Sequence, residues 1–267
     1  MRHLENIMRP LLCLGMLVFI PPAYAEDVAG DNWQQMQGED FIIYYRADVP
    51  DDFVQTTMDC AEDEFKRVMD DLGIAPYENW SLDRRASIYI YSDQEDFVKN
   101  GHQVLWSHGA AFARAKVIKT FPEAQGFFDA ILPHELGHIV FREFVGFTRY
   151  VPLWFEEGMA VYQEKAKRLG AKKAVKEAIE NGQFIPLSKL SHMRLYINSK
   201  QELVELFYAE SASLVYFMIT QLGQQQFFML CREIKNNTPF DRALEKVYLR
   251  FKNLDELNQA WVDYLQG

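Results

Sequence analysis

The sequence predicts an α+β fold, in which an N-terminal half of alternating strands and helices precedes an all-helical C-terminal half. Three observations support this prediction. Strand-like apolar runs lie before residue 121, segments with helical periodicity separate them, and almost everything after Pro152 has helical spacing. No internal repeat or low-complexity linker divides the chain. We therefore expect a single domain, with an α+β lobe over about residues 39–150 and a helical lobe over about 151–267.

The predicted elements of the first half alternate between the two types of secondary structure. Strands are expected at residues 41–45, 86–91 and 111–120, and helices at residues 51–72, 92–98 and 127–145. Gly73 is expected to end the first helix, because glycine readily adopts the left-handed conformation that follows many helices. Ser92 is expected to cap the second helix, with Glu95 at capping-box spacing. The first half therefore supplies a sheet with helices packed against it.

The first 25 residues have the pattern of a secretory signal peptide. Arg2 and Arg9 flank a short basic region, residues 11–20 are apolar, and Ala25 ends an A-x-A cleavage site. The apolar stretch is too short to anchor the chain stably in a bilayer. Cleavage would leave residues 26–267 as the mature chain, exported to the periplasm or the cell exterior. No later apolar run is expected to reach transmembrane length.

The net charge of −10 argues against some classes of partner. The chain has 28 basic and 38 acidic side chains. Such a surface repels phosphate groups, so neither nucleic acid nor an anionic membrane is expected as the main partner. The charge does not identify a substrate, and nothing in the sequence indicates an oligomeric state.

Two cysteines, Cys60 and Cys231, would remain after signal cleavage. An oxidising compartment would permit a disulfide between them. Both, however, lie on apolar faces of predicted helices, where free thiols are commonly buried. A disulfide and two buried thiols are the two alternatives.

The sequence HELGH at residues 134–138 interrupts an apolar helical segment with three polar side chains. On a helix, His134 and His138 lie one turn apart on the same face, close enough to bind one metal ion. Glu135 lies about 100° round the helix and would reach a water on that ion without binding the metal. Composition predicts roughly 0.01 chance matches to H-E-x-x-H in the chain. The alternative is a helix with two solvated or core histidines. Pro133 either bends this helix or marks its first turn.

A second helical segment supplies a third candidate ligand. Residues 154–160 read WFEEGMA, and eighteen residues separate His138 from Glu157. This segment resembles the ligand helix W-L-N-E-G-F-A of the aminopeptidase-N-like branch of the gluzincin metallopeptidases, which has the same spacing. The resemblance implies that Glu157 is the third metal ligand and puts Glu156 at the position of the asparagine. Glu156 is the alternative ligand, or else an exposed or capping carboxylate.

A third match lies in residues 207–218, which resemble the Y-x-x-G helix start of the same branch. Tyr208 takes the position of the tyrosine that supports the oxyanion, but Ser211 replaces the glycine. The alternative is that Tyr208 packs in a helical core. Together with a W-x-x-Y-L segment at residues 261–265, the order of elements over residues 39–265 is most similar to small bacterial peptidase MA-like proteins. The resemblance implies a zincin-like fold, with a mixed N-terminal sheet, helices that include the HELGH helix, and a helical C-terminal lobe.

The resemblance also implies a mechanism. His134, His138 and Glu157 would hold Zn²⁺, which lowers the pKa of a bound water towards ~7. Glu135 would take a proton from that water and return it to the leaving amine. Zinc and Tyr208 would stabilise the oxyanion. The implied protein is an exported zinc peptidase of the gluzincin type, acting on peptides or proteins.

The segment before the HELGH helix favours cleavage within chains. Aminopeptidases of the resembled branch carry G-x-M-E-N there, and its glutamate binds the substrate's amine. Residues 109–113 place Phe112 at that position, and an apolar side chain penalises a buried charged amine. The strand expected at 111–120 would pair with an extended substrate, with Arg114 and Lys116 favouring acidic peptides. Alternatively, these cations only protect an edge strand from aggregation.

The remaining polar groups near these segments have weaker assignments. His102, His108 and His192 lack ligand spacing, and we expect surface or core roles for them. His108, just before the expected strand, is the one candidate substrate contact. If the enzyme did recognise a free amine, Glu156 would be the first candidate for its anchor.

Two other functions compete with a peptidase. The same zinc site would also suit hydrolysis of a non-protein amide, such as one in the cell wall, and no carbohydrate-binding signature separates the two. A non-catalytic binding module of the envelope would retain only the fold. Such a module would be expected to have lost Glu135 or a ligand, whereas this chain keeps the full set.

Overall fold

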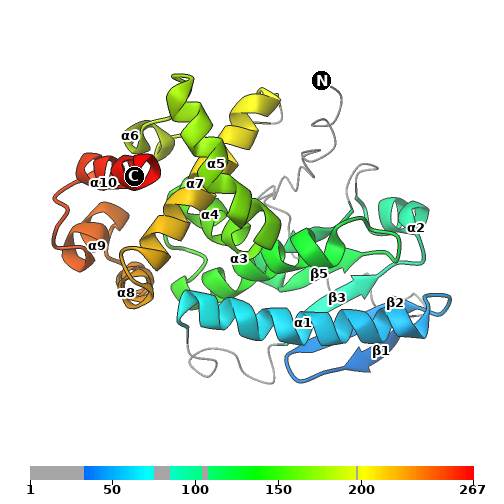
Figure 1. The fold of residues 1–267 in the computed structure, drawn as a ribbon. Helices are drawn as coiled ribbons and strands as arrows, with labels where there is room; N and C mark the ends of the chain where they lie inside the picture. Colours follow the sequence, from blue (N-terminus) through cyan, green and yellow to red (C-terminus); the bar gives the residue numbers. More distant parts are fainter. Residues whose placement is uncertain (1–32, 75–84, 104–107, 197) are drawn as a thin grey trace.

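The computed structural model describes residues 33–74, 85–103, 108–196 and 198–267 (Figure 1). A five-stranded mixed sheet is followed in the chain by a group of helices, which confirms the predicted α+β class. The predicted signal peptide and its cleavage site lie outside the described residues.

The sheet has the strand order β1-β2-β3-β5-β4. The inner strands β2, β3 and β5 run parallel, and the outer strands β1 and β4 run antiparallel to their neighbours. The strands are β1 (Trp33–Gln37), β2 (Phe41–Arg46), β3 (Ala86–Ile90), β4 (Ala110–Phe112) and β5 (Val117–Thr120). β2 and β3 form where the strand-like run at residues 41–45 and the alternation at residues 86–91 predict them. β1 is not expected from the sequence, because three of its five residues are glutamine.

The prediction of one strand over residues 111–120 is wrong. The chain instead forms the antiparallel hairpin β4–β5, which turns through a 3₁₀ helix at Ala113–Ala115. Lys116 follows in the left-handed region, with φ 53°. This conformation is unfavourable for lysine, but Nζ of Lys116 forms an ion pair with Glu143 at 2.9 Å. The hairpin puts β4 at the edge of the sheet.

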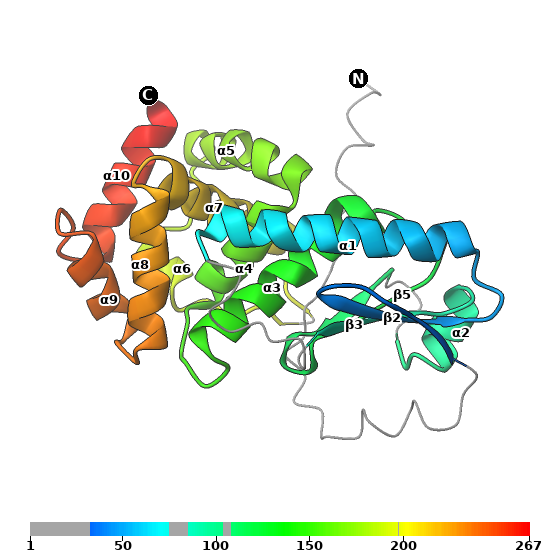
Figure 2. The same cartoon turned by 90° about the horizontal axis from the view of Figure 1, so that it is seen from below.

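Two helices accompany the sheet. The long helix α1 (Asp51–Leu72) packs on β2 and runs across the sheet in both views (Figure 1, Figure 2). As predicted, Gly73 ends it in the left-handed conformation, with φ 69°. The cap of the short helix α2 (Gln94–Lys99) lies one residue later than predicted, because the side chain of Asp93, not of Ser92, accepts the capping hydrogen bond.

The HELGH segment lies in α3 (Leu132–Val145), which follows a π-helical turn over Phe127–Ile131. Pro133 lies in the first turn of α3, so it marks the start of the helix and does not bend its middle. After α3 every described element is a helix, as predicted. These helices are α4 (Leu153–Gln163), α5 (Lys165–Glu180), α6 (Leu187–Leu190), α7 (Gln201–Thr220), α8 (Gln224–Lys235), α9 (Phe240–Val247) and α10 (Leu254–Gln266).

The helix α7 is the central element of the helical half. Its length and composition would allow it to cross a membrane, contrary to the expectation from the sequence. However, 61% of its most apolar window is buried inside the fold, where it packs against α4, α5 and α8. Its apolar character is therefore that of a core helix.

The two cysteines are unpaired. Cys60 is half-buried on α1, and Cys231 is buried on α8. Burial raises the pKa of both thiols, so they remain protonated at neutral pH. Of the two alternatives, the structure has free thiols.

Candidate metal centre

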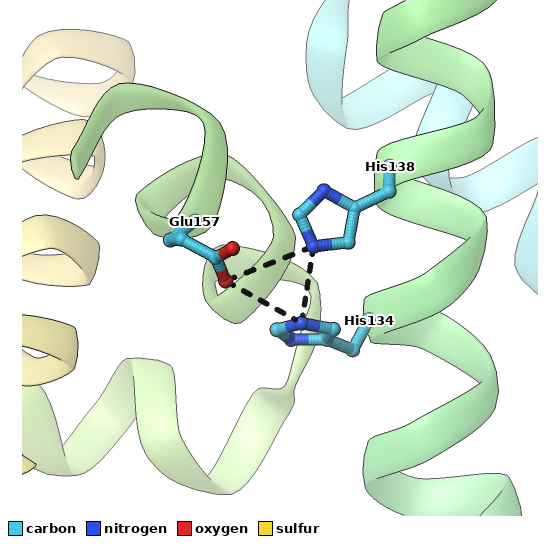
Figure 3. Close-up of side chains that lie close together, drawn as sticks. All are labelled: His134, His138 and Glu157. Atoms are coloured by element: carbon cyan, nitrogen blue, oxygen red, sulfur yellow. Dashed lines mark hydrogen bonds and ion pairs between the residues drawn. The ribbon is translucent and has the colours of Figure 1, made fainter. Parts of the chain in front are cut away.

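Three buried side chains meet where α3 packs against α4 (Figure 3). His134 and His138 project from one face of α3, and Glu157 reaches them from α4. Their exposed fractions are 2%, 8% and 5%, respectively. The structure thus brings the three predicted ligands together, and the alternative of solvated histidines is wrong.

The three ligand atoms form a triangle of a size that suits a metal ion. Nε2 of His134 lies 3.2 Å from Nε2 of His138, and Oε2 of Glu157 lies 3.8 Å and 3.7 Å from these two nitrogens. A point equidistant from the three atoms in their plane lies about 2.1 Å from each, which matches Zn–N and Zn–O bond lengths. Oε2 of Glu157 is buried and has no hydrogen-bond partner among the described residues. A carboxylate in that state is unfavourable unless a cation compensates it, so the residues present fit Zn²⁺.

Two glycines allow the helices that carry these residues to approach closely. A Cβ on Gly137 would lie 3.1 Å from Cα of Ala160, and a Cβ on Gly158 would lie 2.4 Å from the backbone oxygen of Ser211. These contacts stack α3 on α4 and α4 on α7. Because Glu157 is next to Gly158, its position depends on this packing.

Each histidine faces a second carboxylate across its other ring nitrogen. Nδ1 of His134 lies 2.9 Å from Oε1 of Glu164, and Nδ1 of His138 lies 3.8 Å from Oε1 of Glu156. Carboxylates at this position fix the orientation and tautomer of metal-binding histidines. Glu164 is not among the residues predicted from the sequence. It lies in the extended junction between α4 and α5, where helical spacing does not point to it.

Glu156 is held by an ion pair. Nε of Arg142 donates a hydrogen bond to Oε1 of Glu156 at 2.6 Å, and Nη2 donates to Oε2. Both partners are buried, so Glu156 is not an exposed carboxylate. With both of its oxygens bound by Arg142, Glu156 is a poorer candidate than Glu157 for a metal ligand or for an amine anchor.

The carboxylates create a negative field around the histidines. Burial lowers the pKa of His138, but the neighbouring carboxylates, Glu157 foremost, raise it to about 9. Burial raises the pKa of Glu157. Burial also raises the pKa of Glu156, but His138 and Arg142 outweigh it and bring that pKa to about 2. The site therefore favours positive charge between the two histidines, as a bound cation supplies.

The two predicted catalytic residues lie in different surroundings. Glu135 is 5% exposed, and its charge contributes to the raised pKa of His138. Tyr208 is half-buried on α7 and packs against Val161 and Ala212. Its role at an oxyanion stays a prediction.

The structure changes the assignments along the sheet edge. Lys116 is 7% exposed and ion-paired, so it is not available to bind an acidic substrate. Of the two predicted cations only Arg114 is exposed, in the 3₁₀ turn. His102 and His192 are exposed, as expected. His108 lies two residues before β4, and its buried Nδ1 has no hydrogen-bond partner among the described residues.

A family model of the peptidase MA superfamily matches residues 60–267. No curated protein matches the chain. Since the matched region covers most of the chain and includes α3, α4 and α7, the protein belongs to the peptidase MA superfamily. Its family and its buried His134–His138–Glu157 group together indicate a metallopeptidase.

Proposed function

We propose that the protein is an exported zinc-dependent peptidase that hydrolyses bonds within peptide chains. The observation that carries the proposal is the buried triangle of ligand atoms from His134, His138 and Glu157. Membership of the peptidase MA superfamily supports a peptide or protein substrate. Export rests on the signal-like pattern of the first 25 residues.

The residues at the site suit hydrolysis. His134, His138 and Glu157 would hold Zn²⁺, which when bound supplies a Lewis acid for a substrate carbonyl. Glu135 would take the proton of the attacking water and pass it to the leaving amine. Tyr208 would donate a hydrogen bond to the developing oxyanion. Burial of the histidines and Glu157 excludes bulk water, which strengthens each of these electrostatic interactions.

Metal content and turnover of single variants test the assignment of roles. The purified mature protein should bind about one zinc ion per chain, and Glu157→Gln should lower its zinc content far more than Glu156→Gln. Glu135→Gln should keep the metal but lose roughly 10²–10⁴-fold in turnover, because its role is proton transfer. A fully active Glu135→Gln variant would exclude the mechanism. If Glu156→Gln loses more metal than Glu157→Gln, Glu156 is the metal ligand and Glu157 is not.

The edge of the sheet supports cleavage within chains. Phe112 ends β4 where the resembled aminopeptidases carry an amine-binding glutamate. Nζ of Lys119 lies 5.6 Å from the centre of its ring, and a cation there repels a substrate ammonium. β4 is an edge strand of the described sheet, and an extended substrate can pair with such an edge as an added strand.

A pair of matched peptides tests this preference. An N-terminally acetylated peptide and its free-amine twin should be cleaved with similar kcat/KM, at internal bonds. Loss of cleavage on acetylation would show amine recognition and overturn the proposal. A cell-wall amide assayed beside the peptides tests the amidase alternative, which requires hydrolysis of that amide without peptide cleavage.

A further inference from the structure

Glu156 and Glu157 are adjacent, buried carboxylates that face the same histidine. Oε2 of Glu157 lies 3.7 Å from Nε2 of His138, whereas Oε1 of Glu156 lies 3.8 Å from Nδ1 of that ring. The two glutamates therefore contact opposite nitrogens of one imidazole. A mechanism that uses Glu157 as the ligand gives no role to Glu156.

Arg142 fixes the position of Glu156. It lies one turn after His138 on α3, and two of its guanidinium nitrogens bind the two oxygens of Glu156. Its third nitrogen, Nη1, donates to the backbone oxygen of Arg149 at 3.0 Å, in the segment that connects α3 to α4. A two-pronged pair of this kind fixes the direction of a carboxylate as well as its distance. Arg142 thus connects α3, the connecting segment and α4.

The two histidines differ in how firmly they are held. His134 has a hydrogen bond from its ring to Glu164 at 2.9 Å, but the 3.8 Å separation of His138 from Glu156 is too long for one. Glu156 is nevertheless the carboxylate that faces Nδ1 of His138 at ion-pair distance, and a small shift of that carboxylate decides whether the ring nitrogen can donate a hydrogen bond to it. The resembled aminopeptidase branch has a neutral asparagine at this position, whereas Glu156 adds a charge that Arg142 cancels.

We propose that Arg142 and Glu156 act together as a positioning pair, which holds the ring of His138 in the orientation needed for metal binding. The inference rests on the proposed metal site. Neither residue binds the metal, and Arg142 acts only through Glu156. At His134 the corresponding cation is Lys167. It pairs with Glu164 at 2.8 Å but has 43% of its side chain exposed. Because solvent screens it, Lys167 contributes less.

The main test uses two variants that keep the charge and change the geometry. Arg142→Lys and Glu156→Asp should each weaken zinc affinity about tenfold, measured by competition with a chelator. Both should also change the visible absorption spectrum of the Co²⁺-loaded protein, which reports ligand geometry. Lys167→Met is the control, with a change of no more than about threefold expected. The neutral double variant Arg142→Met/Glu156→Gln should bind zinc more tightly than Arg142→Met alone, because Arg142→Met leaves the buried carboxylate of Glu156 without its cation, whereas the amide of the double variant needs none.

The outcomes separate the inference from the proposed function. If Arg142→Lys and Glu156→Asp keep wild-type zinc affinity and Co²⁺ spectrum while their melting temperatures fall, the pair is only structural and the inference is wrong. Failure of the double variant to recover affinity would also overturn it. If the unmodified protein binds neither Zn²⁺ nor Co²⁺, the proposed function and the inference fail together. If Arg142→Lys does not fold, the zinc affinities of Glu156→Asp and of the double variant still test whether the pair positions His138.

Discussion

Replacing Gly158 with alanine tests whether the close packing of α4 on α7 positions Glu157. The new Cβ would lie 2.4 Å from the oxygen and 2.6 Å from the carbonyl carbon of Ser211, and backbone atoms cannot rotate away. Favourable carbon contacts need about 3.5–4.0 Å, so the two helices must separate by roughly 1 Å. Overpacking of this kind lowers the free energy of unfolding by about 1–3 kcal/mol. Because Glu157 moves with α4, zinc affinity should fall as well.

Thermal unfolding of the zinc-free protein measures the packing effect. For a chain of this size, each kcal/mol shifts the melting temperature by about 2–4 °C, so Gly158→Ala should lower it by roughly 2–12 °C. Gly170→Ala is the matched control. Gly170 is a helical glycine on α5 whose added Cβ has no atom within 4 Å, and alanine there should stabilise by up to about 1 kcal/mol. A Gly158→Ala protein as stable as the Gly170→Ala protein, with unchanged zinc affinity, would refute the packing argument.

Three further predictions concern the buried Glu210, the removal of zinc and the N-terminus of the mature protein. Burial raises the pKa of Glu210 to about 8, so folding favours its protonated form. The free energy of unfolding should therefore fall by a few kcal/mol as the pH rises from about 4.5 to about 8. Denaturant titration at several pH values should give a shallower slope for Glu210→Gln, and an unchanged slope would assign the pH dependence to other groups. Removing zinc with a chelator should lower the melting temperature, and added Zn²⁺ should restore it, since a ligand bound only to the folded state stabilises that state; a melting temperature indifferent to zinc argues against the site. Mass spectrometry of protein from the cell envelope should find an N-terminus at Glu26, and an intact Met1 in a cytoplasmic pool would contradict export.

Local sequence patterns predicted the main elements of the fold because those elements depend on local periodicity. The strand-like run of β2, the alternation in β3 and the apolar face of α1 were sufficient, and Gly73 marked a helix end. The hairpin β4–β5 was not predictable in this way. Its turn contains no glycine, proline or asparagine, and the alternation of apolar and charged residues continues through it. The side chain of Lys116 forms an ion pair with Glu143, and its backbone oxygen accepts a hydrogen bond from Ser87; both partners are more than 25 positions away in the chain.

At the metal site, too, local spacing predicts some features, and contacts between residues distant in the chain decide the others. Helical spacing alone places both histidines on one face of α3, but it cannot choose between two adjacent glutamates on α4. That choice depends on which cation each buried carboxylate meets. Arg142 binds Glu156 and Lys167 binds Glu164, whereas Glu157 has no arginine or lysine partner among the described residues and contacts only the two histidines. Since a buried carboxylate needs a compensating cation, Glu157 is the one of the three that a metal ion bound between it and the two histidines would compensate.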